Sequence, residues 1–198
     1  LEMEKAGAAL VEIGIPFSDP IAEGPVIQEA NLRALSAGCT TDKIFDMVAK
    51  LRKKTQIPLA FMAYANSLYK YGYDRFCKRC AEVGIDGLII PDMPFEEKGE
   101  LQEFTGKYDL KLISLIAPTS QERIQMIAKE AEGFIYVVSS LGVTGVRDTI
   151  TTDVGQIVDM IRQVTDVPTA VGFGINKPEQ VHQYTQIADG AIVGSAIV

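Results

Sequence analysis

A single acidic residue, Glu12, stands inside an apolar run of the sequence and is the first candidate for catalysis. Leu10, Val11, Ile13 and Ile15 surround it, a pattern typical of a buried strand. Burying a carboxyl group costs free energy unless the group is paired or neutral, and burial raises its pKa. A carboxyl group that is neutral near pH 7 is suited to general acid catalysis. The alternative is a structural carboxylate that backbone donors satisfy.

The segment after this strand is expected to be a loop, because four proline and glycine residues punctuate it: Pro16, Pro20, Gly24 and Pro25. It carries two more acids, Asp19 and Glu23. On spacing alone, each of these two acids is typical of a turn or of a solvent-exposed surface.

Three loops late in the chain carry glycine and could bind a phosphate group. They are Gly142-Val-Thr-Gly145, Gly172-Phe-Gly-Ile175 and Gly194-Ser-Ala196. Glycine lets backbone N–H groups approach an anion closely, and a following helix start adds a favourable dipole. One such glycine alone would indicate only a turn, but three at consecutive strand ends favour a phosphate site.

The elements that must position these residues alternate between apolar strands and amphipathic helices. We expect strands at 9–15, 58–64, 87–90, 111–116, 134–139, 169–173 and 191–193. We expect helices at 1–6, 26–37, 41–51, 74–83, 96–107, 120–131, 153–164 and 177–187. Expected helix caps are Thr41 or Asp42, then Thr119 in a capping box with Glu122, and Asn176.

This alternation predicts parallel βα units in an α/β fold. We interpret the chain as one domain, residues 1–198, forming a (β/α)₈ TIM barrel that is incomplete, with seven of eight strands. Such barrels typically need about 250 residues. The first strand, most of the first helix and the last helix are expected to be missing. No repeats, linkers or low-complexity segments suggest a second domain. An open doubly wound sheet is the alternative.

Composition excludes several classes of protein. The net charge is −7 and the basic residues are scattered, so no nucleic-acid-binding surface is expected. No apolar run approaches the roughly 20 residues of a membrane span, and the first residues lack a signal-peptide pattern. The 3 cysteines, an odd number, favour reduced thiols. We therefore expect a cytoplasmic protein without a membrane partner.

Other kinds of catalytic chemistry find no support in the sequence. His182 lies on an expected helix between glutamines and is interpreted as solvated. Cys77 and Cys80 have Cys-x-x-Cys spacing but fall on the apolar face of a helix, which favours core packing over redox chemistry or a metal site. No metal ligands and no Ser-His-Asp or Cys-His set are predicted.

Together these residues resemble the tryptophan synthase α subunit family. The family signature E-x-G-x-P-F-S-D-P-x-A-D-G-P-x-I-Q is similar to Glu12 through Gln28, with one departure at Glu23. The other matching segments are Tyr64-Ala-Asn66, Pro91-Asp-Met-Pro94, Ser140-Leu-Gly-Val-Thr-Gly145, Gly172-Phe-Gly174 and Gly194-Ser-Ala-Ile-Val198. The resemblance covers the whole chain in register and implies that the chain is a fragment.

The resemblance implies a lyase that cleaves indole-3-glycerol phosphate into indole and glyceraldehyde 3-phosphate. In this family's scheme, Glu12 would protonate the indole ring carbon and then act as a base on the glycerol hydroxyl. Glu23 would stabilise charge at the indole nitrogen, although the family has an aspartate there. Tyr136 matches the family's tyrosine near that carboxylate.

The remaining implied roles concern binding. Residues expected to bind the indole are Ala22, Met62, Tyr64, Ile89, Phe173 and Ile192. Residues expected to bind the phosphate are Thr144, Gly145, Gly174, Gly194 and Ser195. Residues expected to face a β subunit, in an α2β2 heterotetramer, are Pro16, Asp19, Pro20 and Asp92. No cofactor is expected in this chain, and pyridoxal phosphate is expected only in the β subunit.

The sequence leaves two other functions open. A catalytically weakened regulatory partner of the β subunit is motivated by Glu23, whose extra methylene displaces the carboxylate by roughly an ångström, which can cost ~100-fold in rate. Another phosphate-binding barrel, such as a sugar-phosphate isomerase, is disfavoured by the signature around Glu12.

Overall fold

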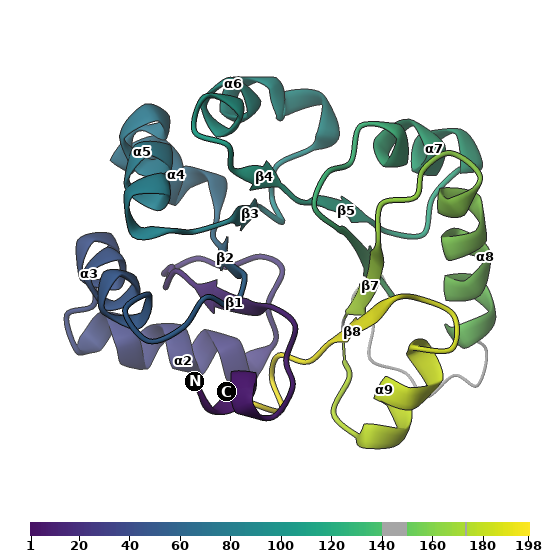
Figure 1. Cartoon of the computed structure of the whole chain (residues 1–198), viewed down its shortest axis with the longest axis horizontal. Coiled ribbons are helices and arrows are strands. Elements are labelled where there is room, and N and C mark those ends of the chain that lie inside the picture. Colours follow the sequence, from purple (N-terminus) through teal and green to yellow (C-terminus); the bar gives the residue numbers. More distant parts are fainter. Residues whose placement is uncertain (140–149, 173) are drawn as a thin grey trace. The chain divides into compact units, whose positions relative to one another are not determined.

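The strands of the protein form two parallel four-stranded sheets (Figure 1). The computed structural model describes residues 1–139, 150–172 and 174–198. By its contacts the chain divides into two compact units, Leu1–Leu112 and Ile113–Val198, with one sheet in each. The α/β class and the parallel strands predicted from the sequence are thus confirmed. None of the helices in the described ranges is long and apolar enough to cross a membrane.

The first unit contains the sheet order β1-β2-β3-β4. Its strands are β1 (Val11–Gly14), β2 (Leu59–Met62), β3 (Gly87–Ile89) and β4 (Lys111–Leu112). Its helices are α1 (Glu2–Lys5), α2 (Pro25–Ser36), α3 (Thr41–Leu51), α4 (Ala65–Tyr71), α5 (Tyr73–Val83), the 3-10 helix η1 (Phe95–Glu97) and α6 (Gly99–Lys107).

The core of the first unit lies on one face of its sheet. Phe45 of α3 and Phe76 of α5 are fully buried, with ring centroids 5.4 Å apart, and Phe61 of β2 completes the cluster, 5.6 Å from Phe45. Side chains alternate between the two faces of a strand. The neighbours of Phe61 on β2, Ala60 and Met62, therefore point to the opposite face.

The second unit contains the sheet order β5-β6-β7-β8. Its strands are β5 (Ser114–Ile116), β6 (Ile135–Val138), β7 (Thr169–Gly172) and β8 (Gly190–Ile192), and its helices are α7 (Gln121–Lys129), α8 (Ile150–Arg162) and α9 (Pro178–Tyr184). Helices α7 and α8 lie side by side (Figure 1). The fully buried residues Ile135, Val137 and Val171 mark the core face of this sheet.

Two elements differ from the sequence-based expectation. The strand expected at 111–116 is divided at Ile113, because its first part pairs with β3 and its second part pairs with β6. Helix α4 was not predicted, since its seven residues are too few to show a helical period. Its first N–H, at Ala65, is capped from a distance, by the Asp92 carboxylate at 2.9 Å.

The expected helix caps are wrong by one or two residues. The Thr40 side chain caps α3 by accepting the N–H of Lys43, in place of Thr41 or Asp42. Ser120 caps α7 in the same way, in place of Thr119. Helix α9 begins after Lys177.

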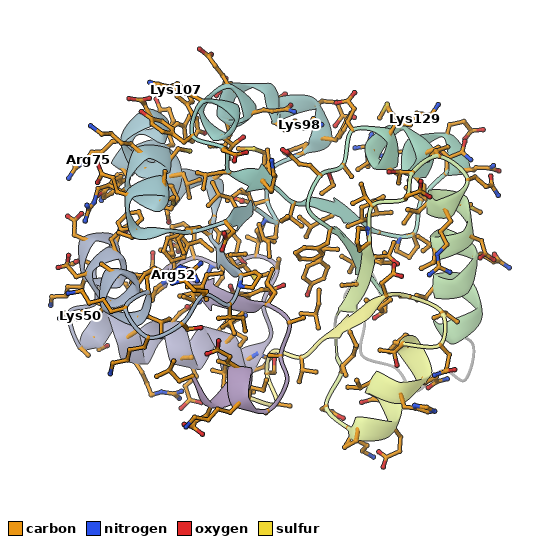
Figure 2. The ribbon with its side chains drawn as sticks, viewed as in Figure 1. Lys50, Arg52, Arg75, Lys98, Lys107 and Lys129 are labelled. Atoms are coloured by element: carbon orange, nitrogen blue, oxygen red, sulfur yellow. The ribbon has the colours of Figure 1, made fainter. Side chains whose placement is uncertain are left out.

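A partly buried arginine joins the strand beginnings of the first unit. Arg52, at the end of α3, donates to the carbonyl oxygens of Gly84 and Ile57 and to the Asp86 carboxylate, the last at 2.6 Å. The same Asp86 oxygen accepts the N–H of Leu59, the first residue of β2, at 2.8 Å. Figure 2 shows Arg52 among the strands, whereas Lys50 lies at the periphery.

The second unit contains the same arrangement. Asp189, just before β8, accepts the N–H of Thr169, the first residue of β7, at 2.9 Å, and Arg162 at the end of α8 faces Asp189 at 3.6 Å. The surrounding residues match in sequence as well: Arg52, Thr55, Pro58 and Ala60 in the first unit, and Arg162, Thr165, Pro168 and Ala170 in the second. We call each Arg-Asp-strand arrangement a clip. This similarity is confined to a few residues around each clip.

Close packing also fixes one glycine of the second sheet. A Cβ added to Gly172 would lie 2.4 Å from Tyr136 Oη and 2.5 Å from two of its ring carbons. The sequence placed Gly172 in a phosphate loop, but the structure gives it a second role, which is to make room for the Tyr136 ring. Gly190, in the neighbouring strand, is not so constrained, because its added Cβ would lie 3.6 Å from Ala170 Cβ, an ordinary contact.

We expect Arg52→Ala to lower the free energy of unfolding by about 2–4 kcal/mol, because it leaves the Asp86 carboxylate and two carbonyl groups without their donor. Lys53→Ala, an exposed neighbour, is the matched control, and Arg162→Ala should cost less than Arg52→Ala because its ion pair is longer and half-exposed. Urea unfolding of the three variants checks the order. Equal losses for Arg52→Ala and Lys53→Ala would contradict it.

We expect Gly172→Ala to lower stability by about 1–3 kcal/mol, because the added methyl group must displace the Tyr136 ring. Gly190→Ala is the matched control in the next strand and should change stability much less. Thermal unfolding of both variants, with near-UV circular dichroism to follow the tyrosine environment, is the measurement. A Gly172→Ala protein that melts like the wild type would refute the steric role.

Candidate functional site

Glu12 lies on the face of the first sheet that is opposite to the helix-covered core. Its strand neighbours Val11 and Ile13 pack against that core. The residue paired with Glu12 on β2 is Ala60, and Gly14 is paired with Met62. A small residue, Ala60, thus lies beside Glu12 in the neighbouring strand.

The environment of Glu12 favours its neutral form. The residue is half-buried, and burial raises the pKa of its carboxyl group from 4.5 to about 7. Among the described residues, no hydrogen-bond donor or cation is found on this carboxylate, so neither opposes the effect of burial. A carboxyl group in this state is half-protonated at neutral pH, where it can both give and take a proton.

Two predicted substrate-binding residues share the Glu12 face of the sheet. Met62 follows Ala60 by two residues on β2, and Ile89 of β3 is paired with Met62. Met62 is half-buried, whereas Ile89 is fully buried. The structure therefore brings Glu12, Met62 and Ile89 to one face, in neighbouring strands.

The loop after β1 folds over Tyr64. The Phe17 ring stacks on the Tyr64 ring at 5.2 Å, and the Ala22 N–H donates to the Tyr64 hydroxyl at 3.1 Å. Tyr64 is 2% exposed. Its ring thus anchors the loop that carries Glu23, a role that the sequence did not indicate.

Glu23 is half-buried and held by polar side chains. Asn31 Nδ2 of α2 donates to Glu23 Oε2 at 2.7 Å, and Gln28 Nε2 donates to the Glu23 carbonyl oxygen at 2.7 Å. Burial raises the pKa of the Glu23 carboxyl group, while hydrogen bonds from Asn31 and Tyr64 oppose the rise. Glu23 is therefore a positioned carboxylate and not a loosely solvated surface acid.

In the second unit, two predicted site residues share one sheet face. Tyr136 is paired with Ala170, and Gly172, which lies under the Tyr136 ring, is paired with Ile192. Tyr136 and Ile192 are both half-buried, on the face opposite to the core residues Val137 and Val171. Phe173 lies outside the described residues.

Three of the five predicted phosphate-binding residues are described, and all three are exposed: Gly174, Gly194 and Ser195. Gly174 has a φ of 73°, so its backbone itself requires glycine. A Cβ added to Gly194 would meet no described atom within 4 Å. Thr144 and Gly145 lie outside the described residues.

The predicted partner-facing residues lie on two loops of the first unit. Pro16, Asp19 and Pro20 belong to the loop after β1, and Asp19 is exposed and accepts a hydrogen bond from Ser18. Asp92 follows β3, is half-buried, and uses one carboxylate oxygen to hold the start of α4.

The two cysteines of the Cys-x-x-Cys pair lie in the core, as predicted. Cys77 and Cys80 are both fully buried on α5, and burial raises the pKa of the Cys77 thiol to about 12 and that of Cys80 further. Neither thiol forms a disulfide. Protonated, buried thiols have no nucleophilic role.

The sequence missed two residues that shape this site, Asn31 and Phe17. Asn31 stands on the stripe of α2 formed by Ile27, Ala34 and Leu35, where an apolar residue would be expected. An amide on such a stripe indicates a buried polar partner. The stacking of Phe17 left no comparable signal.

Comparisons with known proteins identify the family of the chain. The family model for the tryptophan synthase alpha chain matches residues 1–198. Tryptophan synthase alpha chains from Alkaliphilus metalliredigens and Lactiplantibacillus plantarum are 52% and 54% identical over 198 and 197 residues, respectively. The match covers 100% and 99% of this chain but 74% and 75% of these relatives.

Solved structures match as well. Tryptophan synthase subunit alpha from Campylobacter jejuni is 38% identical, with a TM-score of 0.88, over 96% of this chain and 76% of its own. Tryptophan synthase from M. tuberculosis, in an aminoacrylate-bound form, is 30% identical, with a TM-score of 0.87, over 98% of this chain and 75% of that one. The family model, these relatives and these structures all give the same assignment: the chain belongs to the tryptophan synthase alpha chain family.

Proposed function

We propose that Glu12 is the proton-transferring residue with which this chain cleaves indole-3-glycerol phosphate. As a tryptophan synthase alpha chain, the protein is an indole-3-glycerol-phosphate lyase of tryptophan biosynthesis. The observation that supports the assignment to Glu12 is its half-buried carboxyl group, whose pKa burial raises to about 7 and which no described side chain pairs.

The chemistry requires one proton to be gained and one to be lost. Neutral Glu12 gives its proton to the indole ring carbon that bears the glycerol chain, which makes that carbon tetrahedral. The resulting carboxylate takes the proton of the adjacent glycerol hydroxyl as the carbon–carbon bond breaks. Indole leaves, the hydroxyl carbon becomes the aldehyde of glyceraldehyde 3-phosphate, and Glu12 is again protonated. A pKa near the operating pH suits both steps.

Glu23 and Tyr136 complete the proposed catalytic set. Protonation of the ring carbon places positive charge at the indole nitrogen, and the Glu23 carboxylate is proposed to stabilise that charge. This role is supported by the hydrogen bonds that the Glu23 carboxylate receives from Asn31 and Tyr64. For Tyr136, the support is its fixed position above Gly172 on the non-core face of the second sheet.

The proposed indole-binding residues are those named from the sequence: Ala22, Met62, Tyr64, Ile89, Phe173 and Ile192. The support is that Met62 and Ile89 share the Glu12 face, and Ile192 lies in register with Gly172. Tyr64, whose ring is covered by Phe17, would act mainly through the loop that it anchors.

The phosphate is proposed to bind to the backbone of Gly145, Gly174, Gly194 and Ser195, with Thr144 beside them. Gly194 supports this assignment, because no described atom and no positive φ requires glycine there. A glycine that folding does not require fits a place where backbone must stay open to an anion.

For the fold, we propose a (β/α)₈ barrel and a single domain over residues 1–198. The parallel strands and the match to relatives' structures over 96% to 99% of this chain support that assignment. Alternating βα units and short apolar strands, both expected of a barrel, are features of the described chain.

We further propose an α2β2 assembly with a tryptophan synthase β subunit, which would hold the pyridoxal phosphate and consume the indole. The proposed contact residues are Pro16, Asp19, Pro20 and Asp92. The exposure of Asp19 supports this surface. A cytoplasmic location is proposed as well, since all three cysteines are free thiols.

We expect Glu12→Gln to lower indole release by at least about 100-fold, because the amide can neither give nor take the proton. In the wild type, kcat/KM should fall as pH rises through about 7, since the acid form of Glu12 is then lost. Steady-state indole release with and without the β subunit is the measurement. Glu29→Gln, an exposed acid on α2, is the matched control.

Two outcomes would separate the lyase from a regulatory partner. If wild-type protein releases no more indole than Glu12→Gln in either condition, but still activates the β subunit, the lyase assignment fails. Binding of an indole-propanol phosphate analogue distinguishes both from a sugar-phosphate isomerase, which has no reason to hold the indole ring.

The raised pKa of Glu12 also predicts a pH-dependent stability. The folded protein binds the Glu12 proton more tightly than the unfolded chain does, so stability falls as pH rises from about 4.5 to about 7. Glu12→Gln, which has no proton to lose, should match the wild type near pH 4 and exceed it by up to about 3 kcal/mol above pH 7. Urea unfolding at several pH values tests this, and parallel curves for the two proteins would be the contrary result.

A further inference from the structure

We propose that Asn31 is a positioning residue that fixes the Glu23 carboxylate for the reaction. The inference rests on the proposed function only for the role of Glu23; the hydrogen bond that carries it is a property of the fold. Asn31 Nδ2 lies 2.7 Å from Glu23 Oε2.

Asn31 is the only buried residue of α2, at 8% exposed. An amide in that position loses its hydration and therefore needs a protein partner. The partner is a carboxylate eight positions earlier in the chain, outside the helix. A helix that places its one buried side chain on this carboxylate is arranged to hold it.

The two ends of this hydrogen bond differ in rigidity. Glu23 belongs to the loop after β1, whereas Asn31 lies in the middle of the 12-residue helix α2, far from either fraying end. The helix carries a second anchor as well, since Gln28 Nε2 holds the Glu23 carbonyl oxygen at 2.7 Å. Gln28 thus fixes the backbone of Glu23, and Asn31 fixes its charged group.

The Asn31 amide also acts on the charge of Glu23. An N–H donor stabilises the ionised form of a carboxyl group, so Asn31 lowers the pKa of Glu23 against the effect of burial. The titratable side chain packed against Glu23 is Tyr64, from the end of β2, and it acts in the same direction. Asp92, from the loop after β3, faces Tyr64 and acts on the pKa of that hydroxyl.

The hydrogen bond between Asn31 and Glu23 explains how a glutamate can act at a position where the family has an aspartate. The extra methylene of glutamate adds a rotatable bond, which would let an unrestrained carboxylate swing by roughly an ångström. Asn31 restricts that freedom by binding Oε2. An orientation set by a rigid helix is the kind of preorganisation that charge stabilisation requires.

The test uses Asn31→Leu, which removes the donor and keeps a side chain branched at Cγ, and Asn31→Asp, which places a second carboxyl group against Glu23. Carboxyl carbon NMR titration of Glu23 should show an upward shift of its pKa in both variants, larger in Asn31→Asp because of like-charge repulsion. For Asn31→Leu, kcat/KM for indole release should fall about 10-fold, mainly through kcat, because the loss is one of transition-state stabilisation.

Two controls isolate the carboxylate contact. Gln28→Ala removes the anchor on the Glu23 backbone and should leave the pKa of the Glu23 carboxyl group unchanged. Leu32→Ala, at an exposed neighbouring position of α2, should change neither the titration nor the activity. Thermal melts establish that each variant is folded, and Asn31→Asp provides the titration should Asn31→Leu fail to fold.

The outcomes separate this inference from the proposed function. An unchanged Glu23 titration in the folded Asn31 variants, or an equal fall in activity for Leu32→Ala, would overturn the positioning role. Full activity of Glu12→Gln alongside a shifted Glu23 titration would instead overturn the proposed function and leave the Asn31–Glu23 contact standing.

Discussion

The half-buried carboxyl group of Glu12 is the main electrostatic constraint on the first unit. One face of its strand joins the core around Phe45, Phe61 and Phe76, whereas Glu12 lies on the other face, beside Ala60. Burial raises the pKa of this carboxyl group and destabilises its charge, and no described donor opposes that effect. Stability lost there must come from elsewhere in the fold, and the Arg52 clip and the aromatic core are the described sources.

The sequence predicted the parallel α/β architecture because strands covered on both faces read as continuous apolar runs. The sequence-based prediction failed for elements that depend on contacts with residues distant in sequence. Helix α4 depends on Asp92 from another loop, and the strand at 111–116 changes partner at Ile113. The clips could not be predicted, because Arg52 and Arg162 have the sequence pattern of ordinary helix-end cations. Only the fold places Asp86 and Asp189 beside them.

The carboxylates of the candidate site could be predicted from the sequence, but the residues that hold the site in place could not. Glu12 stood out because a charge in an apolar strand is conspicuous, and the family pattern singled out Glu23. The residues that position the site, Asn31 and Gly172, carry no such signal in the sequence. Asn31 and Gly172 act on residues 8 and 36 positions away, respectively, and only the folded chain shows that Asn31 meets a carboxylate and Gly172 meets a tyrosine ring. The residues that do chemistry were thus easier to find than the residues that hold them.

The two clips close short stretches of chain, since Leu59 and Asp86 are 27 residues apart and Thr169 and Asp189 are 20 apart. Contacts between residues near in sequence lose little chain entropy and form early. Each clip therefore joins one pair of neighbouring strands, β2 and β3 or β7 and β8, through residues that are near in sequence. Folding of this chain would begin at two places, each organised around an arginine at a helix end and an aspartate at the next strand.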